Sequence, residues 1–291
     1  MRKSRLLTNL GLFSSLLLLP VAHGSPVTYS SPAVDCEHTQ DNNNDDTETQ
    51  VQEEDNCMLV MHGKIHKSLK LTETPDQQDL TVVGSSSCQL TILAVGPGGE
   101  GYYSGGGSGY LNYKTVAVQN GGGAIIFHVG YGVPGDLTTV NIPFWDGNFT
   151  LIAERGKDSH YNSKDGFYYG GDGYSGGGSQ NCPTCNFTCN TCYGGSNGGN
   201  GGGDWAGHGT RENITDYMFS SWKLTPGAGG KKRQGKYDGV LGGGGGGVMV
   251  DGAGPEASQY QGQGYGGGGD GEEDGYGFAL QGIILLEVNQ S

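Results

Sequence analysis

Residues 242–252 read Gly-Gly-Gly-Gly-Gly-Gly-Val-Met-Val-Asp-Gly, so a run of six glycines leads directly into a short apolar segment. Glycine makes up 59 of the 291 residues, and shorter runs occur at 105–107, 121–123, 176–178, 201–203 and 266–269. Glycine loses more backbone freedom on folding than any other residue and brings no side chain to bury. The chain therefore either leaves these runs unfolded or uses the missing side chains for close contact between backbones.

We expect the glycine-rich segments to pack side by side, with random-coil linkers as the alternative. Glycine-rich chains can adopt the polyproline II conformation, which has about three residues per turn and no internal hydrogen bonds. Several such helices can satisfy each other's backbone groups, because only glycine permits so close an approach. Aromatic residues within the segments favour this bundle of polyglycine II helices, and collagen is excluded because there is no Gly-X-Y register. The glycine segments are residues 96–109, 170–178, 194–209, 227–247 and 262–277.

Segments typical of β-strands alternate with the glycine segments from Cys57 onward. Residues 88–95 combine β-branched content with partial alternation of apolar and polar residues. No stretch keeps apolar residues at helical spacing, so we expect little α-helix. Short strands with glycine-rich connections predict a mainly β fold, as a sandwich or a barrel. The expected strands are residues 58–61, 88–95, 110–118, 124–129, 137–142, 148–153, 248–250 and 276–288.

The N-terminus has the pattern of a secretory signal peptide. Arg2, Lys3 and Arg5 precede an apolar stretch that ends at Pro20 and is short for a membrane span. We expect cleavage after Gly24, with an uncleaved anchor as the alternative. The protein is thus expected to be secreted and extracellular, and no later segment is apolar enough to predict a membrane span.

An acidic leader, which we expect to be disordered, covers residues 25–56, and one glycine-rich domain follows at 57–291. The leader holds nine Asp or Glu residues and no Lys or Arg. Removing residues 1–24 takes away three basic and no acidic residues, so the formal net charge falls from −14 to −17. Such a charge argues against nucleic acid or an anionic membrane as partner, since both need a positive surface. It is compatible with basic partners or divalent cations.

The cysteines are expected to form disulfides, because a signal peptide implies an oxidising compartment. The last four form C-x2-C-x3-C-x2-C, which we interpret as a small disulfide knot. Zinc is the alternative, although the two halves of a zinc ribbon normally lie further apart. An odd count leaves one cysteine free or bonded to another chain. The seven candidates are Cys36, Cys57, Cys88, Cys182, Cys185, Cys189 and Cys192.

Three internal Asn-x-Thr triplets are candidate glycosylation sites, at Asn148, Asn186 and Asn213. No motif predicts a catalytic residue, a metal site or a cofactor. Residues 96–101 match G-x-G-x-x-G, but more glycine follows where a dinucleotide site needs a helix. The acidic run 270–274 could hold calcium weakly through its oxygens, and we prefer to interpret it as a hydrophilic turn.

The order of strand and glycine segment resembles a known type of module. Residues 90–99 leading into 105–111 resemble the opening of metazoan extracellular glycine-rich modules, and residues 242–252, 261–269 and 282–288 resemble their C-terminal half. A related region occurs in the ectodomains of the anaplastic lymphoma kinase and leukocyte tyrosine kinase receptors. The resemblance implies an antiparallel β-sandwich similar to tumour necrosis factor, with inserted polyglycine helices in a hexagonal bundle. It covers roughly residues 85–291, and no ligand-contact residue carries over.

These observations lead to a functional expectation. We expect a secreted, non-enzymatic structural or recognition protein of the extracellular matrix, mucus or a mineralised skeleton. Its aromatic residues suit a protein or glycan partner, and its charge suits calcium or a mineral surface. The alternative is a soluble ligand-binding or signalling module related to the receptor ectodomains. An enzyme is the third hypothesis, with no catalytic motif to support it.

Overall fold

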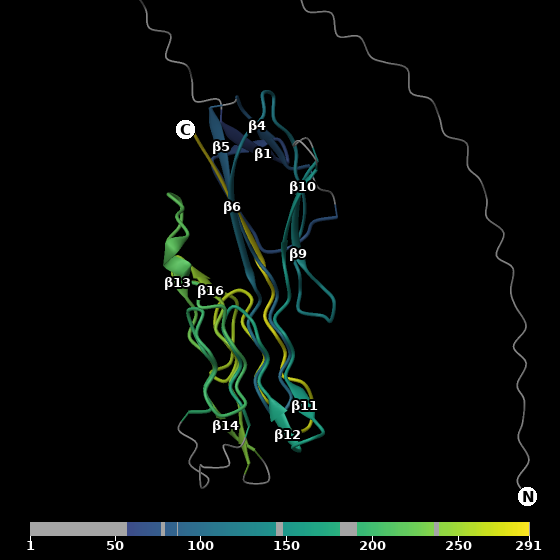
Figure 1. The fold of residues 1–291 in the computed structure, drawn as a ribbon. Coiled ribbons are helices and arrows are strands. Elements are labelled where there is room, and N and C mark those ends of the chain that lie inside the picture. The colour runs from purple at the N-terminus through teal and green to yellow at the C-terminus, as the bar shows by residue number, and fades with distance from the viewer. Residues whose placement is uncertain are drawn as a thin grey trace, which may run out of the picture. The chain divides into compact units, whose positions relative to one another are not determined.

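The computed structural model describes residues 57–76, 79–85, 87–143, 148–180, 191–235 and 239–290. All of them belong to the unit Gln52–Ser291. Their regular structure is β, and every strand pair is antiparallel (Figure 1). The only helix among these residues is the single 3₁₀ turn η1 (Ile214–Asp216). The prediction of a mainly β, antiparallel fold with little helix is therefore confirmed.

One four-stranded sheet, with the order β3-β17-β5-β6, organises the core. Its centre is the pair β5 (Cys88–Val95) and β17 (Ile283–Gln290), which run antiparallel from Ile283 opposite Val95 to Gln290 opposite Cys88. The outer strands are β3 (Ser68–Leu71) and β6 (Leu111–Ala117). Both central strands are nearly continuous apolar runs, which is typical of strands buried on both faces.

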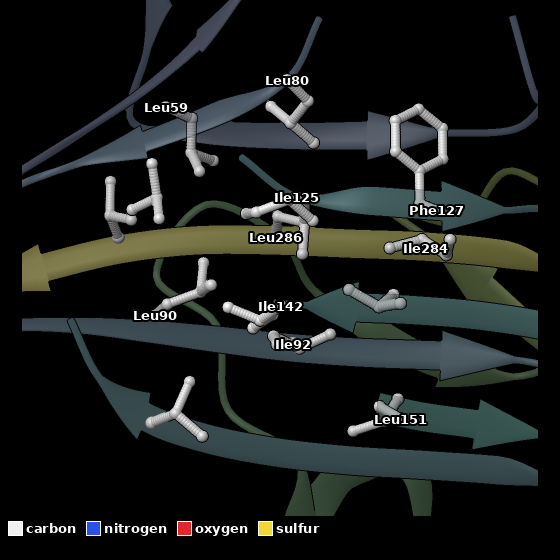
Figure 2. Packing of buried hydrophobic residues seen from close by; sticks show 14 of the residues in the cluster. Leu59, Leu80, Leu90, Ile92, Ile125, Phe127, Ile142, Leu151, Ile284 and Leu286 are labelled. Carbon is white, nitrogen blue, oxygen red and sulfur yellow. The ribbon is translucent and has the colours of Figure 1, made fainter. Parts of the chain in front are cut away.

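Two smaller sheets supply the other side of the main hydrophobic cluster. Residues Leu90, Ile92, Ile284 and Leu286 of the central pair pack with Phe127 and other side chains of the smaller sheets (Figure 2). The first of these sheets has the order β2-β1-β4-β7 and the second β10-β9-β8. Their strands are β1 (Met58–Met61), β2 (Lys64–His66), β4 (Thr81–Val83), β7 (Gly123–Ala124), β8 (Ile126–His128), β9 (Thr138–Ile142) and β10 (Phe149–Ala153).

The opposite face of β5 and β17 buries a second cluster. Leu93, Val95, Ile283 and Leu285 alternate with the residues of the first cluster, as the two-residue period of a strand requires. They pack against Val248 and other residues of the later chain. The remaining strands are two-stranded ladders: β11 (His160–Asn162) with β12 (Phe167–Tyr169), β13 (Leu224–Pro226) with β16 (Val248–Val250), and β14 (Arg233–Gln234) with β15 (Val240–Leu241).

The glycine segments are held by backbone hydrogen bonds to one another, with a period of three residues. The amides of Gly242 and Gly245 donate to Tyr103 and Gly106, three residues apart on one neighbour. In the same way, amides 243 and 246 donate to the carbonyls of residues 192 and 195, and amides 244 and 247 donate to those of residues 260 and 263. Carbonyls of the same run accept from residues 178, 227, 230, 268 and 271, so the run contacts six different stretches of chain. Segment 96–109 repeats this period, because amides 105 to 110 donate in turn to residues 178, 269, 157, 175, 266 and 154.

Side chains would not fit at these contacts. A Cβ built on Gly244 would overlap the carbonyl oxygen of Gly268, and one built on Gly107 would overlap that of Asp172. Buried backbone groups need partners, and here those partners are backbone groups of neighbouring segments, many of them glycines. The alternative of random-coil linkers does not describe these residues.

Most expected strands are confirmed, several with bounds that shift by a residue or two, and the last one starts much later than expected. Residues 276–282 are not part of the last strand, because the Gly277 amide and carbonyl both pair with Gly101 in the neighbouring glycine segment. The expected strand 124–129 is divided into β7 and β8. The strands that were not predicted from the sequence are β2, β3, β4 and β13 and the short ladders β11–β12 and β14–β15.

Candidate functional site

The hairpin β11–β12 lies at the tip of glycine segment 96–109 (Figure 1). The Ser104 hydroxyl donates to the Tyr168 carbonyl at 2.7 Å, and its oxygen accepts from the Gln180 amide at 2.8 Å. The Ser159 hydroxyl exchanges hydrogen bonds with the backbone of Tyr102 at 2.6 and 3.1 Å. These contacts attach the hairpin to Tyr102 and Ser104 of glycine segment 96–109.

Five tyrosine rings from four different stretches of chain meet at this tip. We name Tyr102, Tyr103, Tyr161, Tyr168 and Tyr276 the tyrosine cluster. The rings of Tyr103 and Tyr168 stack with centroids 4.7 Å apart, and Tyr161 lies 4.9 Å from Tyr168. Tyr102 contacts Tyr103 at 4.7 Å, Tyr168 at 5.1 Å and Tyr276 at 5.3 Å. Two members are largely exposed, Tyr161 at 54% and Tyr276 at 62%.

The other face of the same hairpin carries a second aromatic stack. Phe167 stacks on Trp205 with centroids 4.1 Å apart, and Tyr169 stacks on His160 at 5.4 Å. Residues 167 and 169 share this face because side chains alternate along a strand, while 168 points to the tyrosine cluster. The Tyr169 hydroxyl donates to Asp165 at 2.6 Å, and this hydrogen bond, followed by burial, raises the pKa of Tyr169.

The surroundings of the tyrosine cluster are acidic. Burial, then the neighbouring Tyr102, and then the carboxylates of Glu273 and Asp274 raise the pKa of Tyr103. Burial and Tyr102 likewise raise the pKa of Tyr168. The phenols of Tyr103 and Tyr168 are therefore protonated at neutral pH and can donate hydrogen bonds.

The acidic run 270–274 contacts a base. Arg233 lies 2.9 Å from Glu272 and 3.6 Å from Asp270 and packs over the ring of Tyr260. Burial raises the pKa of Asp270, and the positive charge of Arg233 acts in the opposite direction. Arg233 and Glu272 also line a pocket of about 250 Å³ together with Glu273 and Asp274. Across the described residues, no group of three or more His, Cys, Asp or Glu could hold a metal ion.

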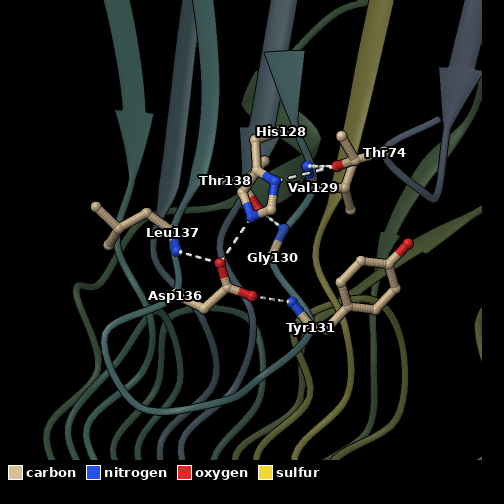
Figure 3. A network of polar contacts seen from close by, with 8 residues as sticks. All are labelled: Thr74, His128, Val129, Gly130, Tyr131, Asp136, Leu137 and Thr138. Atoms are coloured by element: carbon tan, nitrogen blue, oxygen red, sulfur yellow. Dashed lines mark hydrogen bonds and ion pairs between the residues drawn. The ribbon is translucent and has the colours of Figure 1, made fainter. Parts of the chain in front are cut away.

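A hydroxyl–imidazole–carboxylate chain connects Thr74, His128 and Asp136 (Figure 3). The Thr74 hydroxyl lies 3.2 Å from His128 Nδ1, and His128 Nε2 lies 2.7 Å from Asp136. Three successive amides, those of Val129, Gly130 and Tyr131, donate to Thr74, Thr138 and Asp136. The network thus occupies the backbone donors that an oxyanion would need. Its three members are widely spaced in the sequence, so no local motif could reveal it.

The prediction that the cysteines form disulfides can be compared with the structure at Cys57, Cys88 and Cys192. Cys57 and Cys88 form a disulfide across 31 residues that joins the start of the domain to β5. Cys192 is buried and disulfide-bonded, and its partner lies outside the described residues. Cys36, Cys182, Cys185 and Cys189 lie outside the described residues as well.

The glycosylation candidates differ in surroundings. Asn148 is exposed directly before β10. Asn213 is half-buried and caps η1, where its side-chain oxygen accepts from the Thr215 amide. Asn186 lies outside the described residues.

Sequence reasoning identified most members of the tyrosine cluster as aromatics within glycine segments, but it missed Tyr161. A hairpin pattern in the sequence could have revealed Tyr161, since aromatic residues at 160–161 and 167–169 flank the turn sequence Ser-Lys-Asp-Gly.

Within the described ranges, no helix is long and apolar enough to cross a membrane. A scan against protein-family models finds no family that matches the chain, and a search of the curated proteins finds no match.

Proposed function

We propose that this chain is a secreted, non-enzymatic recognition and structural protein of the extracellular matrix, mucus or a mineralised skeleton. Its domain would be a β-sandwich similar to tumour necrosis factor that carries a bundle of polyglycine II helices, as in the glycine-rich receptor ectodomains. The tyrosine cluster and the second aromatic stack would form its contact surface. A formal net charge of −14 would also favour association with calcium-bearing surfaces.

The period of three supports polyglycine II helices. A helix with three residues per turn directs every third amide toward the same neighbour. Amides 242 and 245 share one neighbour, and amides 105 and 108 share another. A strand would instead alternate between two sides with a period of two. Contacts to six stretches around residues 242–247 are those expected of a hexagonal bundle.

The observation that carries the recognition role is a rigid aromatic surface with an acidic border. Tyrosine and tryptophan are enriched at protein interfaces because they bury a large area and lose little conformational entropy. Tyr161 and Tyr276 are exposed although their rings rest on other rings. The carboxylates of Glu273 and Asp274 border this surface. We therefore propose an extracellular protein with a basic surface as the partner, since opposite charge speeds association and aids specificity.

Affinity capture from an extracellular extract tests this proposal, with the double variant Tyr161→Ala/Tyr276→Ala beside the wild type. Loss of two central aromatic contacts of about 2 kcal/mol each is expected to weaken binding by roughly a thousandfold. Tyr131→Ala is the matched control, because Tyr131 is 47% exposed and lies outside the cluster. The binding constant of each captured protein is then measured with all three chains.

The outcomes separate the alternatives. A basic partner that loses affinity only with the double variant supports the proposal. Nanomolar binding to a receptor or cytokine-like protein would favour the signalling module instead. Equal binding by all three chains, or binding that a purified glycan alone reproduces, contradicts a protein partner at the tyrosine cluster.

A further inference from the structure

The tyrosine cluster has a geometry suited to a covalent reaction as well as to binding. Each exposed ring lies against a half-buried one: Tyr276 is 5.3 Å from Tyr102, and Tyr161 is 4.9 Å from Tyr168. Both pairs are tilted, with interplanar angles of 38° and 48°. Tyr161 and Tyr168 are also directly opposite each other in the β11–β12 ladder.

We propose that the tyrosine cluster is a site of oxidative coupling, at which hydrogen peroxide and a haem peroxidase join Tyr102 to Tyr276 and Tyr161 to Tyr168 as dityrosine. Each phenol gives up one electron and its hydroxyl proton and becomes a phenoxyl radical. Two radicals combine at the ring carbons ortho to oxygen, which forms one carbon–carbon bond. The two ring protons then move to the oxygens and restore both phenols. One hydrogen peroxide takes up two electrons and two protons and leaves as two molecules of water.

The arrangement favours coupling within one chain over coupling between chains. Groups held in contact react at a high effective concentration, because their loss of translational freedom has already occurred on folding. The exposed rings of Tyr161 and Tyr276 are accessible to an oxidant. The backbones of their half-buried neighbours, Tyr102 and Tyr168, are held by hydrogen bonds with the side chains of Ser159 and Ser104. Burial raises the pKa of Tyr168, so its phenol is protonated at neutral pH and oxidation removes its electron and proton together.

The bond between Tyr102 and Tyr276 would join the first glycine segment to the last. Gly101 and Gly277, the neighbours of these tyrosines, already exchange two backbone hydrogen bonds. Coupling would make this junction covalent. This inference does not depend on the proposed partner, since the reaction needs only the chain and the oxidant.

The purified full chain is treated with hydrogen peroxide and a haem peroxidase, and the monomer is isolated by size exclusion. Dityrosine fluorescence is measured, and cross-linked peptides are mapped by mass spectrometry. We expect monomeric protein with peptides linking residue 102 to 276 and 161 to 168, each lighter by two hydrogen atoms. Tyr276→Phe is expected to abolish the first peptide and Tyr161→Phe the second, while Tyr131→Phe leaves both unchanged.

Three results would overturn the proposal. One is fluorescence found only in dimers and larger products, which would mean coupling between chains. Another is cross-linking in the monomer that maps to Tyr131 or Tyr193, which among the described residues are the exposed tyrosines outside the cluster. The third is no coupling at all in wild-type chain whose circular dichroism shows it to be folded. Partner binding is measured without oxidant, so failure of coupling and failure of recognition are told apart.

Discussion

The sheet β3-β17-β5-β6 and the glycine segments both bury their backbones, but they use side chains in opposite ways. In the sheet, Ile92 and Leu286 are completely buried and fill the space between sheets. Around residues 242–247 there is no side chain to fill space, and carbonyl oxygens occupy the volume that a Cβ would need. The first region is stabilised mainly by apolar area removed from water, and the second by the completeness of backbone pairing.

The difference predicts different tolerances to change. An apolar core accepts substitutions that conserve volume. A bundle of bare backbones has no side-chain volume to conserve, so at most of its contacts an added Cβ meets a main-chain group that cannot rotate away. The regions are joined through the second hydrophobic cluster, where Val248 directly follows the six glycines and packs with Ile283 and Leu285.

Amide hydrogen exchange gives the largest contrast between a packed bundle and a linker. We expect amides 242–247 to exchange as slowly as those of β5 and β17, more slowly than free peptide by roughly a thousandfold or more. The exposed turn at Gly135 serves as the internal control and exchanges rapidly. Mass spectrometry of proteolytic fragments measures all three regions at once. Rapid exchange throughout 242–247 would show that these residues behave as linkers.

Adding one methyl group tests the contact itself. Gly244→Ala places a Cβ against the backbone of Gly268, and we expect it to lower the free energy of unfolding by about 3 kcal/mol or more. Gly275→Ala is the matched control within a glycine segment, because the nearest atom to its Cβ is Glu272 Oε2 at 3.9 Å. Alanine there is expected to be neutral or to stabilise by up to about 1 kcal/mol, since it restricts the unfolded chain. Urea denaturation measures both, and equal effects would contradict packing through the backbone.

The sheet could be predicted from the sequence in more detail than the glycine segments could. Residues 88–95 and 248–250 were predicted as strands with their correct bounds. The reason is that β-branched apolar residues favour a strand through their own local preference, whatever they contact elsewhere in the fold. The glycine segments were predicted to pack, but their neighbours were not. Glycine carries no pattern that distinguishes one partner from another, so pairings such as Gly178 with Gly243 depend on the whole fold.

The candidate site shows the same limit. Individual tyrosines in the glycine segments were predicted to be contact residues. That residues 102, 161, 168 and 276 meet could not be predicted, since no spacing in the sequence relates them. Tyr276 was placed in a strand, whereas its neighbour Gly277 pairs with Gly101 at the tip.

Removing the disulfide tests whether the two regions unfold together. Replacing both Cys57 and Cys88 with serine frees a loop across 31 residues, which is expected to cost roughly 3 to 4 kcal/mol. If the regions form one cooperative unit, amides of β5 and of residues 242–247 lose protection by the same factor. Loss confined to the strands would show that the glycine segments hold together independently. Oxidised wild-type protein, measured in the same way, provides the control, since its other disulfides stay intact in both samples.

The smallest expected effect concerns Glu287, the buried carboxylate that continues the alternation of the second cluster. Its oxygens accept from the Ser220 amide and hydroxyl and from the Ser221 amide, at 2.8 to 2.9 Å. Burial alone would raise the pKa of Glu287, but these hydrogen bonds outweigh it and hold the pKa below its ordinary value. Glu287→Gln is expected to cost about 1 to 3 kcal/mol at neutral pH, because a neutral amide accepts these bonds more weakly.

The pH dependence of unfolding distinguishes this charge from simple packing. Because the folded pKa of Glu287 is depressed, its contribution is complete above the ordinary glutamate pKa and is lost as pH falls through the folded value. The difference between wild type and Glu287→Gln should therefore shrink between neutral pH and a pH of about 3. Glu256→Gln, at an exposed position, should show no such change. A difference in unfolding free energy that stays constant with pH would mean that Glu287 acts through its shape, as the apolar residues around it do. Residues 220–221 would then be held to β17 by packing alone.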